Sequence, residues 1–338
     1  MGRYCGTNVR ILVTGASGFI GHHVVRTLLG RGFDVTATGR SQAALAPLAQ
    51  AGARTVTADL ASDPLDDMVR GHTAVVNCAA LAAPWGRRDS FVRNNVRTAE
   101  RLLDVSVAAG IKRFVHLSSP SIYASFKDQL GVTEAFTPPS KWSSPYGETK
   151  WLSEQIVLDR RFASLEPVVL RPRAVFGEGD RVILPRILAV ARKGIFPLMN
   201  GGAARVDVTY VANVVTAVEL ALATSRENAG RAYNITNGEP ISVRELLDRL
   251  FSALGVRVKY IPLPESFAYG LANLSEAVAR WRPNGGEPRL TRYGISLLAH
   301  SLTLDISAAR ERLGYRPQVS LQEGFERCGA WWRQHAAA

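Results

Sequence analysis

A glycine turn between a strand and a helix restricts this chain to very few folds. The run Thr14 to Gly21 reads TGASGFIG, with glycines three residues apart. The β-branched run Val9 to Thr14 precedes it, and Phe19 to Leu29 follows with apolar residues at helical spacing. Such a turn brings backbone N–H groups and the positive end of a helix to one point, where a pyrophosphate binds. The predicted dinucleotide-binding residues of this turn are Gly15, Ser17, Gly18, Phe19, Ile20 and Gly21.

Further short apolar runs alternate with helical patterns along the first half of the chain. The predicted strands are Asp34 to Thr38, Thr55 to Ala58, Ala74 to Asn77, Phe114 to Ser118 and Val168 to Leu170. The predicted long helices are Phe91 to Ala109, with a stripe of Val92, Val96, Ala99, Leu103 and Val107, and Tyr146 to Arg161. Alternation of this kind predicts an α/β fold with a doubly wound parallel sheet of Rossmann type.

The pattern becomes less regular after Gly177, where prolines interrupt the helices. We therefore expect a Rossmann domain over residues 1–177, to which 207–236 return. We expect a smaller substrate-binding subdomain from 178–206 and 237–303, and a C-terminal helical segment over 304–338. A chain of 338 residues with 46% hydrophobic residues is long enough for two joined units.

Composition argues against several classes of protein. The net charge of +12 comes from scattered arginines without a run of like charge, so we expect no nucleic-acid partner. The most apolar segment, Val211 to Ala223, carries Asn213 and Glu219 and predicts a buried helix rather than a membrane span. Three distant cysteines, Cys5, Cys78 and Cys328, favour neither disulfides nor zinc, and the six histidines show no metal-ligand spacing. A cytoplasmic protein without a metal is expected.

The end of the second predicted strand carries information about the cofactor. A site for NAD usually has an acidic residue there, but this chain has Gly39 and Arg40. A guanidinium pairs with a 2′-phosphate, and a glycine leaves room for it. The sequence therefore favours NADP(H) over NAD(H). Asp59, after the third strand, is the expected partner of the adenine ring.

Hydroxyl and amine side chains lie after the fifth predicted strand and at the start of the next helix. Ser118 to Tyr123 lie at the carboxyl end of a strand, where side chains face the cofactor crevice. Tyr146 and Lys150 are one helical turn apart and so share a helix face. The strand end, Tyr146 and Lys150 are expected to converge at one site.

With these motifs the chain resembles the extended short-chain dehydrogenases/reductases over nearly its whole length. The matching segments are the Gly15, Gly18, Gly21 turn, Asn77 to Ala80, Asn95-Val96, Ser118 to Tyr123, Tyr146 to Lys150, Arg171 to Gly177 and Leu313 to Pro317. The resemblance implies that Ser119 holds the substrate oxygen, that Tyr146 transfers a proton, and that Lys150 fixes the nicotinamide ribose. It also implies cofactor contacts by Leu60, Ala79, Pro172 and Val175, and a homodimer formed through the two long helices.

Lys150 has a second implied role. A free tyrosine has a pKa near 10, so proton transfer near neutrality needs a shift of about three pKa units. A nearby lysine cation supplies much of that shift, and we expect Lys150 to acidify Tyr146.

Two substrate classes are implied by the resemblance. Many extended members act on nucleotide sugars and use an Asn and an Arg to hold them. Here Arg173-Ala174 stands at the first place and Val206 at the second, with Arg205 available only if the register slips by one. The residues that hold the sugar diphosphate in those enzymes are therefore not matched in this chain.

The chain is also similar to the branch of 3β-hydroxysteroid dehydrogenases and 2-alkyl-3-oxoalkanoate reductases. This favours NADPH-dependent reduction of a hydrophobic ketone, a β-keto acid or sterol-like, or the reverse reaction. Trp85, Ser121, Phe176, Ile195, Phe196 and Met199 are expected to line the pocket, and Phe267 to Trp281 predicts a soluble amphipathic helix. The alternatives are a nucleotide-sugar epimerase or dehydratase, a non-catalytic NADPH-binding redox sensor, and a reductase of CoA thioesters or flavonoid ketones.

Overall fold

A seven-stranded parallel sheet forms the larger part of the molecule. The computed structural model describes residues 9–159, 164–191, 193–281, 286–288 and 290–335; Cys5 and the end of the helix predicted to reach Arg161 lie outside them. Its strands are β1 Arg10–Thr14, β2 Asp34–Gly39, β3 Arg54–Thr57, β4 Ala74–Asn77, β5 Arg113–Leu117, β7 Glu166–Pro172 and β12 Arg231–Ile235. Their order is β12-β7-β5-β4-β1-β2-β3, so the predicted doubly wound sheet is confirmed.

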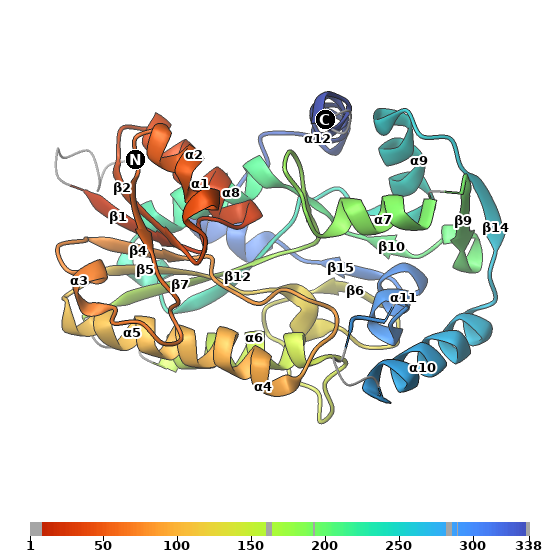
Figure 1. Cartoon of the computed structure of the whole chain (residues 1–338), viewed down its shortest axis with the longest axis horizontal. Helices are drawn as coiled ribbons and strands as arrows, with labels where there is room; N and C mark the ends of the chain where they lie inside the picture. Colours follow the sequence, from red (N-terminus) through yellow and green to blue (C-terminus); the bar gives the residue numbers. More distant parts are fainter. Residues whose placement is uncertain (1–8, 160–163, 192, 282–285, 289, 336–338) are drawn as a thin grey trace.

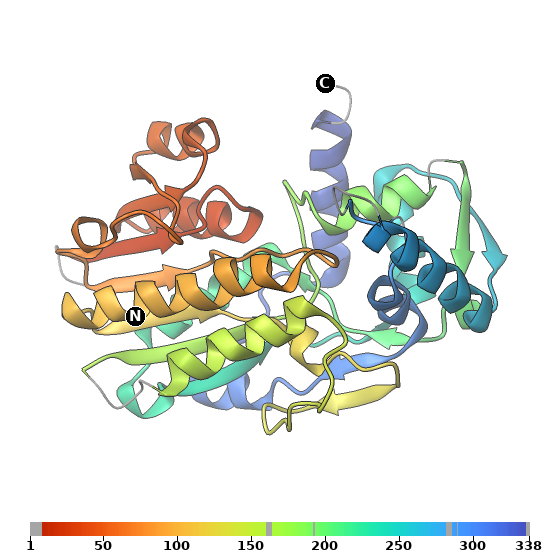
Figure 2. The same ribbon diagram turned by 60° about the horizontal axis from the view of Figure 1, so that its bottom comes forward.

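Helices cover both faces of this sheet (Figure 1). One face carries α1 Phe19–Gly30, α2 Gln42–Gln50 and α8 Val211–Ala223, which enclose a core of mostly aliphatic residues. The other face carries α3 Asp66–Val69, α4 Arg88–Phe91, η1 Val92–Arg97, α5 Thr98–Ala108 and α6 Pro145–Asp159. Figure 2 shows α5 and α6 side by side on that face. Burial on both faces explains why the strands read as continuous apolar runs.

The long helix predicted from Phe91 to Ala109 differs from its expected pattern. It begins at Arg88, and η1 is a π-helical turn. A π turn adds a residue and rotates the rest of the helix, so Val92, Val96 and Val107 of the predicted stripe are only partly buried. Asn95 is buried instead. Its side chain accepts from Leu81 N at 2.7 Å and donates to Thr149 Oγ1 of α6 at 3.0 Å.

Most of the remaining elements form a second unit beside the carboxyl ends of the large sheet (Figure 1), whereas the turn Ala309–Leu313 packs in the core of the large sheet. A four-stranded sheet has the order β13-β10-β15-β6, and two strand pairs are β8-β11 and β9-β14. Their bounds are β6 Gln129–Val132, β8 Val175–Phe176, β9 Ile195–Leu198, β10 Arg205–Val206, β11 Thr209–Tyr210, β13 Ile241–Ser242, β14 Lys259–Pro262 and β15 Leu302–Leu304. The helical elements are α7 Ile183–Ala191, α9 Val243–Leu254, α10 Glu265–Trp281, α11 Arg292–Ala299, α12 Leu321–His335, and the short turns η2 Pro120–Tyr123, η3 Met199–Gly202, η4 Arg226–Asn228 and η5 Ala309–Leu313.

Four elements bear on the predicted division of the chain. Strand β12 and helix α8, from the predicted return segment 207–236, both lie on the large sheet. Strand β6 comes from within residues 1–177, yet it pairs with β15 of the small sheet. Helix α12 packs against α9, where Gly329 meets the backbone of Ala253.

The amphipathic helix predicted at Phe267 to Trp281 is α10, but its large apolar residues face outward. Its buried positions are Ala268, Ala272, Glu276 and Ala279, whereas Phe267, Leu271, Leu274, Val278 and Trp281 are exposed. Among the described residues, no helix combines the length and apolar character that crossing a membrane requires.

A buried ion pair fixes α6 to the large sheet. Glu154 of α6 is fully buried, and its two carboxylate oxygens accept from Nε and Nη2 of Arg171 on β7. Arg171 also donates to the Tyr123 hydroxyl, which in turn donates to Asn234 Oδ1 at 2.8 Å. Each charge in this network is hydrogen-bonded, which is the condition for a charge to remain in a protein interior.

Replacing Glu154 by Gln should destabilise the protein by about 3–5 kcal/mol, because the Arg171 guanidinium would remain buried without an opposite charge. The shift of the urea-unfolding midpoint measures this loss. Glu219→Gln is a suitable control, since Glu219 pairs with Arg31, which is 52% exposed, and should lose less than about 1 kcal/mol. Equal losses in the two variants would contradict this role of the ion pair.

Candidate active site

The glycine turn after β1 is shaped for a close approach of a ligand to the backbone. Gly15 has a φ of 65°, and a Cβ there would lie 2.7 Å from Ala79 N, so only glycine fits. Gly18 donates to Gly15 O at 2.9 Å and precedes α1. Because a glycine stands at this position, no side chain there caps the first N–H groups of α1, at Phe19, Ile20 and Gly21. The turn fits a pyrophosphate.

A cavity of about 170 Å³ opens beside this turn. It contains the predicted cofactor residues Gly15, Ser17, Gly18, Arg40, Asp59, Leu60 and Ala79, and also Thr38, Gly39, Ala58, Cys78, Ala80, Leu81, Asn94 and Thr98. The other predicted residues do not line it: Phe19, Ile20 and Gly21 begin α1, Pro172 ends β7, Val175 begins β8, and Lys150 is buried in α6. The structure therefore brings most of the predicted cofactor contacts into one hollow.

The Arg40 end of the cavity is open to solvent. Arg40 is exposed, and no ion pair of its side chain occurs within the part of the chain that the structure describes. A Cβ on Gly39 would lie 2.5 Å from Ser17 Oγ. An acidic residue at position 39 would thus displace Ser17, and the arrangement leaves Arg40 as a charged group available at this end.

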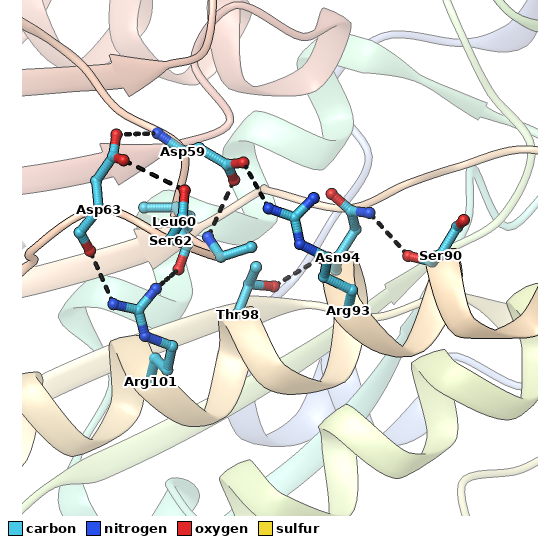
Figure 3. Close-up of polar contacts among 10 residues, drawn as sticks. Asp59, Leu60, Ser62, Asp63, Ser90, Arg93, Asn94, Thr98 and Arg101 are labelled. Atoms are coloured by element: carbon cyan, nitrogen blue, oxygen red, sulfur yellow. Dashed lines mark hydrogen bonds and ion pairs between the residues drawn. The ribbon is translucent and has the colours of Figure 1, made fainter.

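Hydrogen bonds hold the loop that carries Asp59 (Figure 3). Asp59 Oδ1 accepts from Ala61 N at 3.0 Å, and Oδ2 accepts from Arg93 Nη2 at 3.1 Å. Asp59 N donates to Asp63 Oδ2 at 2.8 Å, and Arg101 bonds the carbonyls of Leu60 and Asp63. The predicted adenine partner is therefore held in a fixed orientation by its own loop and by the long helix.

Ser119, Tyr146 and Lys150 converge at the end of β5. Ser119 caps η2, where its Oγ accepts from Ser121 N at 3.2 Å, and its side chain lies close enough to Tyr146 to act on the pKa of that phenol. Tyr146 lies in the first turn of α6. One turn later, Lys150 is 1% exposed and its Nζ donates to Leu117 O at 2.5 Å.

The electrostatics of these groups are dominated by burial. Burial raises the pKa of Tyr146 to about 12, while the Ser119 side chain acts in the opposite direction. Burial lowers the pKa of Lys150 to about 8, opposed by the charge of Glu154. Because Lys150 bonds a backbone carbonyl here, its expected acidification of Tyr146 remains a prediction for the cofactor complex. Burial also raises the pKa of Cys78 to about 12, so this thiol stays protonated.

A polar chain beneath the site was not predicted from the sequence. Thr14 Oγ1 donates to Asn77 Oδ1 at 2.7 Å, which directs Asn77 Nδ2 to His116 Nδ1 at 3.1 Å. His116 Nε2 lies 3.3 Å from Ser153 Oγ and 3.5 Å from Lys150 Nζ. Burial holds the pKa of His116 well below its usual value, so the ring is neutral and carries its proton on Nε2. In the sequence, the sole indication of this hydrogen-bond network is that Asn77 and His116 stand within apolar strands.

Arg173 and Tyr293 were also not predicted as site residues. Arg173 follows β7 and is 7% exposed, and its Nε has no hydrogen-bond partner. Tyr293 of α11 influences the pKa of Tyr146 and is itself influenced by the charge of Arg173. Ala174, the next residue, has a φ of 41°, a left-handed conformation that is unusual without glycine.

The predicted pocket residues separate into different environments. Phe176 stacks on Phe325 with ring centroids 4.7 Å apart, so it belongs to the core of the second unit. Met199 is buried in a smaller cluster that includes Ile295, Phe196 is buried in the core and Ile195 is exposed. Trp85 is half-buried beneath the Arg280 guanidinium. Ser121 is buried and its Oγ is unpartnered.

The side chains of Arg205 and Val206, the candidates for holding a sugar diphosphate, lie in different environments. Arg205 is exposed, and its guanidinium donates to Pro240 O at 2.9 Å. Val206, its neighbour on β10, packs into the core of the second unit.

Comparisons with known proteins agree with this geometry. The NAD dependent epimerase/dehydratase family model matches residues 11–236. A 2-alkyl-3-oxoalkanoate reductase from Stenotrophomonas maltophilia is 36% identical, with 95% of this chain and 99% of the relative covered. The 3beta-hydroxysteroid-dehydrogenase/decarboxylase isoform 1 of Arabidopsis thaliana is 33% identical, covering 94% of this chain and 78% of the relative.

A solved structure, MoeE5 in complex with UDP-glucose and NAD, superposes with a TM-score of 0.76. It is 28% identical in sequence, with 97% of this chain and 99% of that chain covered. The glycine turn, the strand order and these matches lead to one conclusion: the chain belongs to the NAD dependent epimerase/dehydratase family, within the extended short-chain dehydrogenases/reductases.

Proposed function

We propose that this protein is an NADP(H)-dependent ketoreductase that interconverts a hydrophobic ketone, a β-keto acid or a sterol-like compound, and its secondary alcohol. The observation that carries the proposal is the closeness of Ser119, at the end of β5, to Tyr146, with Lys150 buried one turn further along α6. The relatives named for a 3-oxoalkanoate and for a 3β-hydroxysteroid support the substrate class.

A nicotinamide dinucleotide bound at the glycine turn would supply the hydride that adds to the carbonyl carbon. Tyr146 donates its hydroxyl proton to the carbonyl oxygen and becomes a phenolate. Ser119 donates a second hydrogen bond to the same oxygen, where negative charge develops. A pKa of about 12 keeps Tyr146 protonated throughout the physiological range, and we expect Lys150 to lower this pKa once the dinucleotide is bound.

The dinucleotide is expected to lie between the turn and the Asp59 loop. Gly15, Ser17, Gly18 and the first N–H groups of α1 would bind the pyrophosphate, and Asp59 and Leu60 would contact the adenine. We propose that the dinucleotide is also contacted by Leu60, Ala79, Pro172 and Val175. The exposed Arg40 would pair with a 2′-phosphate, which supports NADP(H), although the solved relative holds NAD.

Nucleotide-sugar conversion is the second candidate, since the solved relative binds UDP-glucose. Two observations weigh against it here. The Arg205 guanidinium is bound to Pro240 O, and Val206 is packed in the core, so the expected second grip on a diphosphate is missing from the described part of the site. A non-catalytic NADPH sensor is disfavoured because the serine, the tyrosine and the lysine converge.

We also propose a homodimer through α5 and α6. These helices lie side by side on one face of the molecule (Figure 2), and Leu152 of α6 is 37% exposed there. A four-helix contact would bury this apolar side chain.

Replacing Tyr146 by Phe should lower kcat by at least about 100-fold, because the proton donor is lost. Affinity for NADPH should stay within about twofold, as measured by fluorescence titration. Steady-state rates with 2-alkyl-3-keto acids and 3-ketosteroids measure the loss. Tyr210→Phe is the control, since Tyr210 is bonded to Glu178 in the second core and should leave turnover unchanged. Undiminished turnover of a ketone by Tyr146→Phe would refute the proposed mechanism.

Replacing Arg40 by Ala should weaken NADPH binding by about 10- to 100-fold and leave NADH binding unchanged, since only NADPH has the 2′-phosphate. Calorimetric titration of both cofactors gives the two affinities without reliance on turnover. Arg70→Ala removes a guanidinium that pairs with Asp67 at the surface, and it should alter neither affinity. Equal affinity of the unmodified protein for NADH and NADPH would exclude the proposed role of Arg40.

Replacing Leu152 by Asp should convert the dimer to a monomer, because the charge would be buried at the contact between the helices. Sedimentation velocity measures the mass in solution. Leu274→Asp on α10, also an exposed leucine, should leave the dimer intact. A monomeric wild-type protein, or a Leu152→Asp dimer of unchanged stability, would show that these helices do not form the contact.

A further inference from the structure

Arg173 is a buried cation whose side chain has no ion-pair partner among the described residues. It is 7% exposed, its Nε has no hydrogen bond, and within the described residues its guanidinium forms no ion pair. Arg171, two positions earlier, is equally buried but is bonded to both oxygens of Glu154. An arginine cannot lose its proton to escape the cost of burial. The contrast between these neighbours indicates that Arg173 awaits an anion from outside the chain.

One buried acidic side chain, Asp207, lies near Arg173 without pairing with it. Asp207 is close enough for its charge to act on Arg173, but it forms no ion pair with it, and its Oδ2 accepts from Leu304 N at 2.7 Å. The backbone of Arg173 is occupied: its N donates to Ile235 O and its carbonyl accepts from Thr209 Oγ1. These bonds fix the residue at the end of β7 while the guanidinium remains unsatisfied.

Tyr293 connects Arg173 to the proposed proton donor. Arg173 lines one small hollow together with Ser296 and Leu297 of α11, the helix that carries Tyr293. Arg173 and Tyr293 act on each other's pKa, and Tyr293 also raises the pKa of Tyr146. Burial raises the pKa of Tyr293, which therefore remains a neutral phenol able to donate a hydrogen bond. Tyr293 is thus a potential hydrogen-bond donor that acts electrostatically on both Arg173 and Tyr146.

We propose that Arg173, assisted by Tyr293, binds a carboxylate that the substrate carries close to its reacting carbon. This rests on the proposed ketoreductase function and narrows it to β-hydroxy and β-keto acids over neutral ketones. A guanidinium fork matches the two oxygens of a carboxylate. Arg173 lines a small hollow of about 10 Å³ together with Lys127 and His300, and of these Lys127 is exposed. A single buried cation suits a carboxylate better than a diphosphate.

A ligand-binding role predicts an unusual effect on stability. Arg173→Met should leave the melting temperature of the apoprotein unchanged or raise it, because it removes an unpaired buried charge. Arg171→Met should lower the melting temperature, since it leaves Glu154 buried without its partner. A purely structural Arg173 would instead give a loss of stability similar to that of Arg171→Met, and that result would overturn the proposal.

The substrate test uses the oxidation direction, in which the acid is chemically stable. The probes are a long-chain 2-alkyl-3-hydroxy acid and its methyl ester, each with NADP⁺. The assay is run at alkaline pH, where part of Tyr146 is phenolate; the C3 hydride goes to the cofactor and the hydroxyl proton to that phenolate. Wild-type kcat/KM should favour the acid by about 100-fold. Arg173→Met should lose that factor for the acid, mainly through KM, and change the ester by less than about threefold; Arg173→Lys should be intermediate.

A binding measurement complements turnover. In the presence of NADPH, the hydroxy acid should raise the melting temperature of wild type but not of Arg173→Met, whereas the ester should raise neither. Equal wild-type kcat/KM for acid and ester would overturn the Arg173 proposal and leave the ketoreductase function standing. Turnover of neither probe, nor of any ketone, would overturn the proposed function itself. A melting-temperature shift by UDP-glucose that depends on Arg173 would assign the residue to a phosphate instead.

Discussion

The buried ion pair between Glu154 and Arg171 sets the position of the proposed catalytic helix. Tyr146, Lys150 and Glu154 are spaced four residues apart, so they lie along one face of α6. Glu154 is anchored to β7 through Arg171, and Lys150 is anchored to β5 through Leu117 O. With two polar anchors on two adjacent strands, the helix can neither slide nor rotate without exposing a buried charge to an apolar environment. Tyr146, one turn before Lys150, is placed opposite Ser119 as a consequence.

A second polar network couples that helix to the phosphate turn. It begins at Thr14, directly before Gly15, and passes through Asn77 and His116 to Ser153. Each member has its bond directed by the one before, which gives the neutral His116 a single consistent tautomer. This network crosses β1, β4 and β5 beneath the sheet edge. Apolar residues at these positions would pack without directed hydrogen bonds. Polar residues buried in three adjacent strands therefore fix the register between the expected cofactor turn and the expected proton donor.

The sequence predicts those parts of the structure that depend on local pattern. The strand–turn–helix at Gly15 and the shared face of Tyr146 and Lys150 can be read from spacing alone, and the sheet from alternating elements. The features that could not be predicted depend on long-range packing. Phe176 reads equally well as pocket or core, and its partner Phe325 lies far along the chain in α12. The stripe of the long helix is shifted by a π turn that no residue type in Val92 to Arg97 announces. The partnered and unpartnered states of Arg171 and Arg173 look identical in sequence.

That last pair shows how stability and recognition can be separated along one strand. The cost of burying a guanidinium is the same in kind at both positions, because each leaves water at the end of β7. At Arg171 the chain offsets it internally with Glu154, and the result is a fixed helix. At Arg173 the offset is left to an incoming group, so part of the favourable electrostatic energy is released only when that group binds. A charge already desolvated and held by its backbone loses little further freedom on binding. It therefore discriminates strongly between a substrate that carries an anion and one that does not.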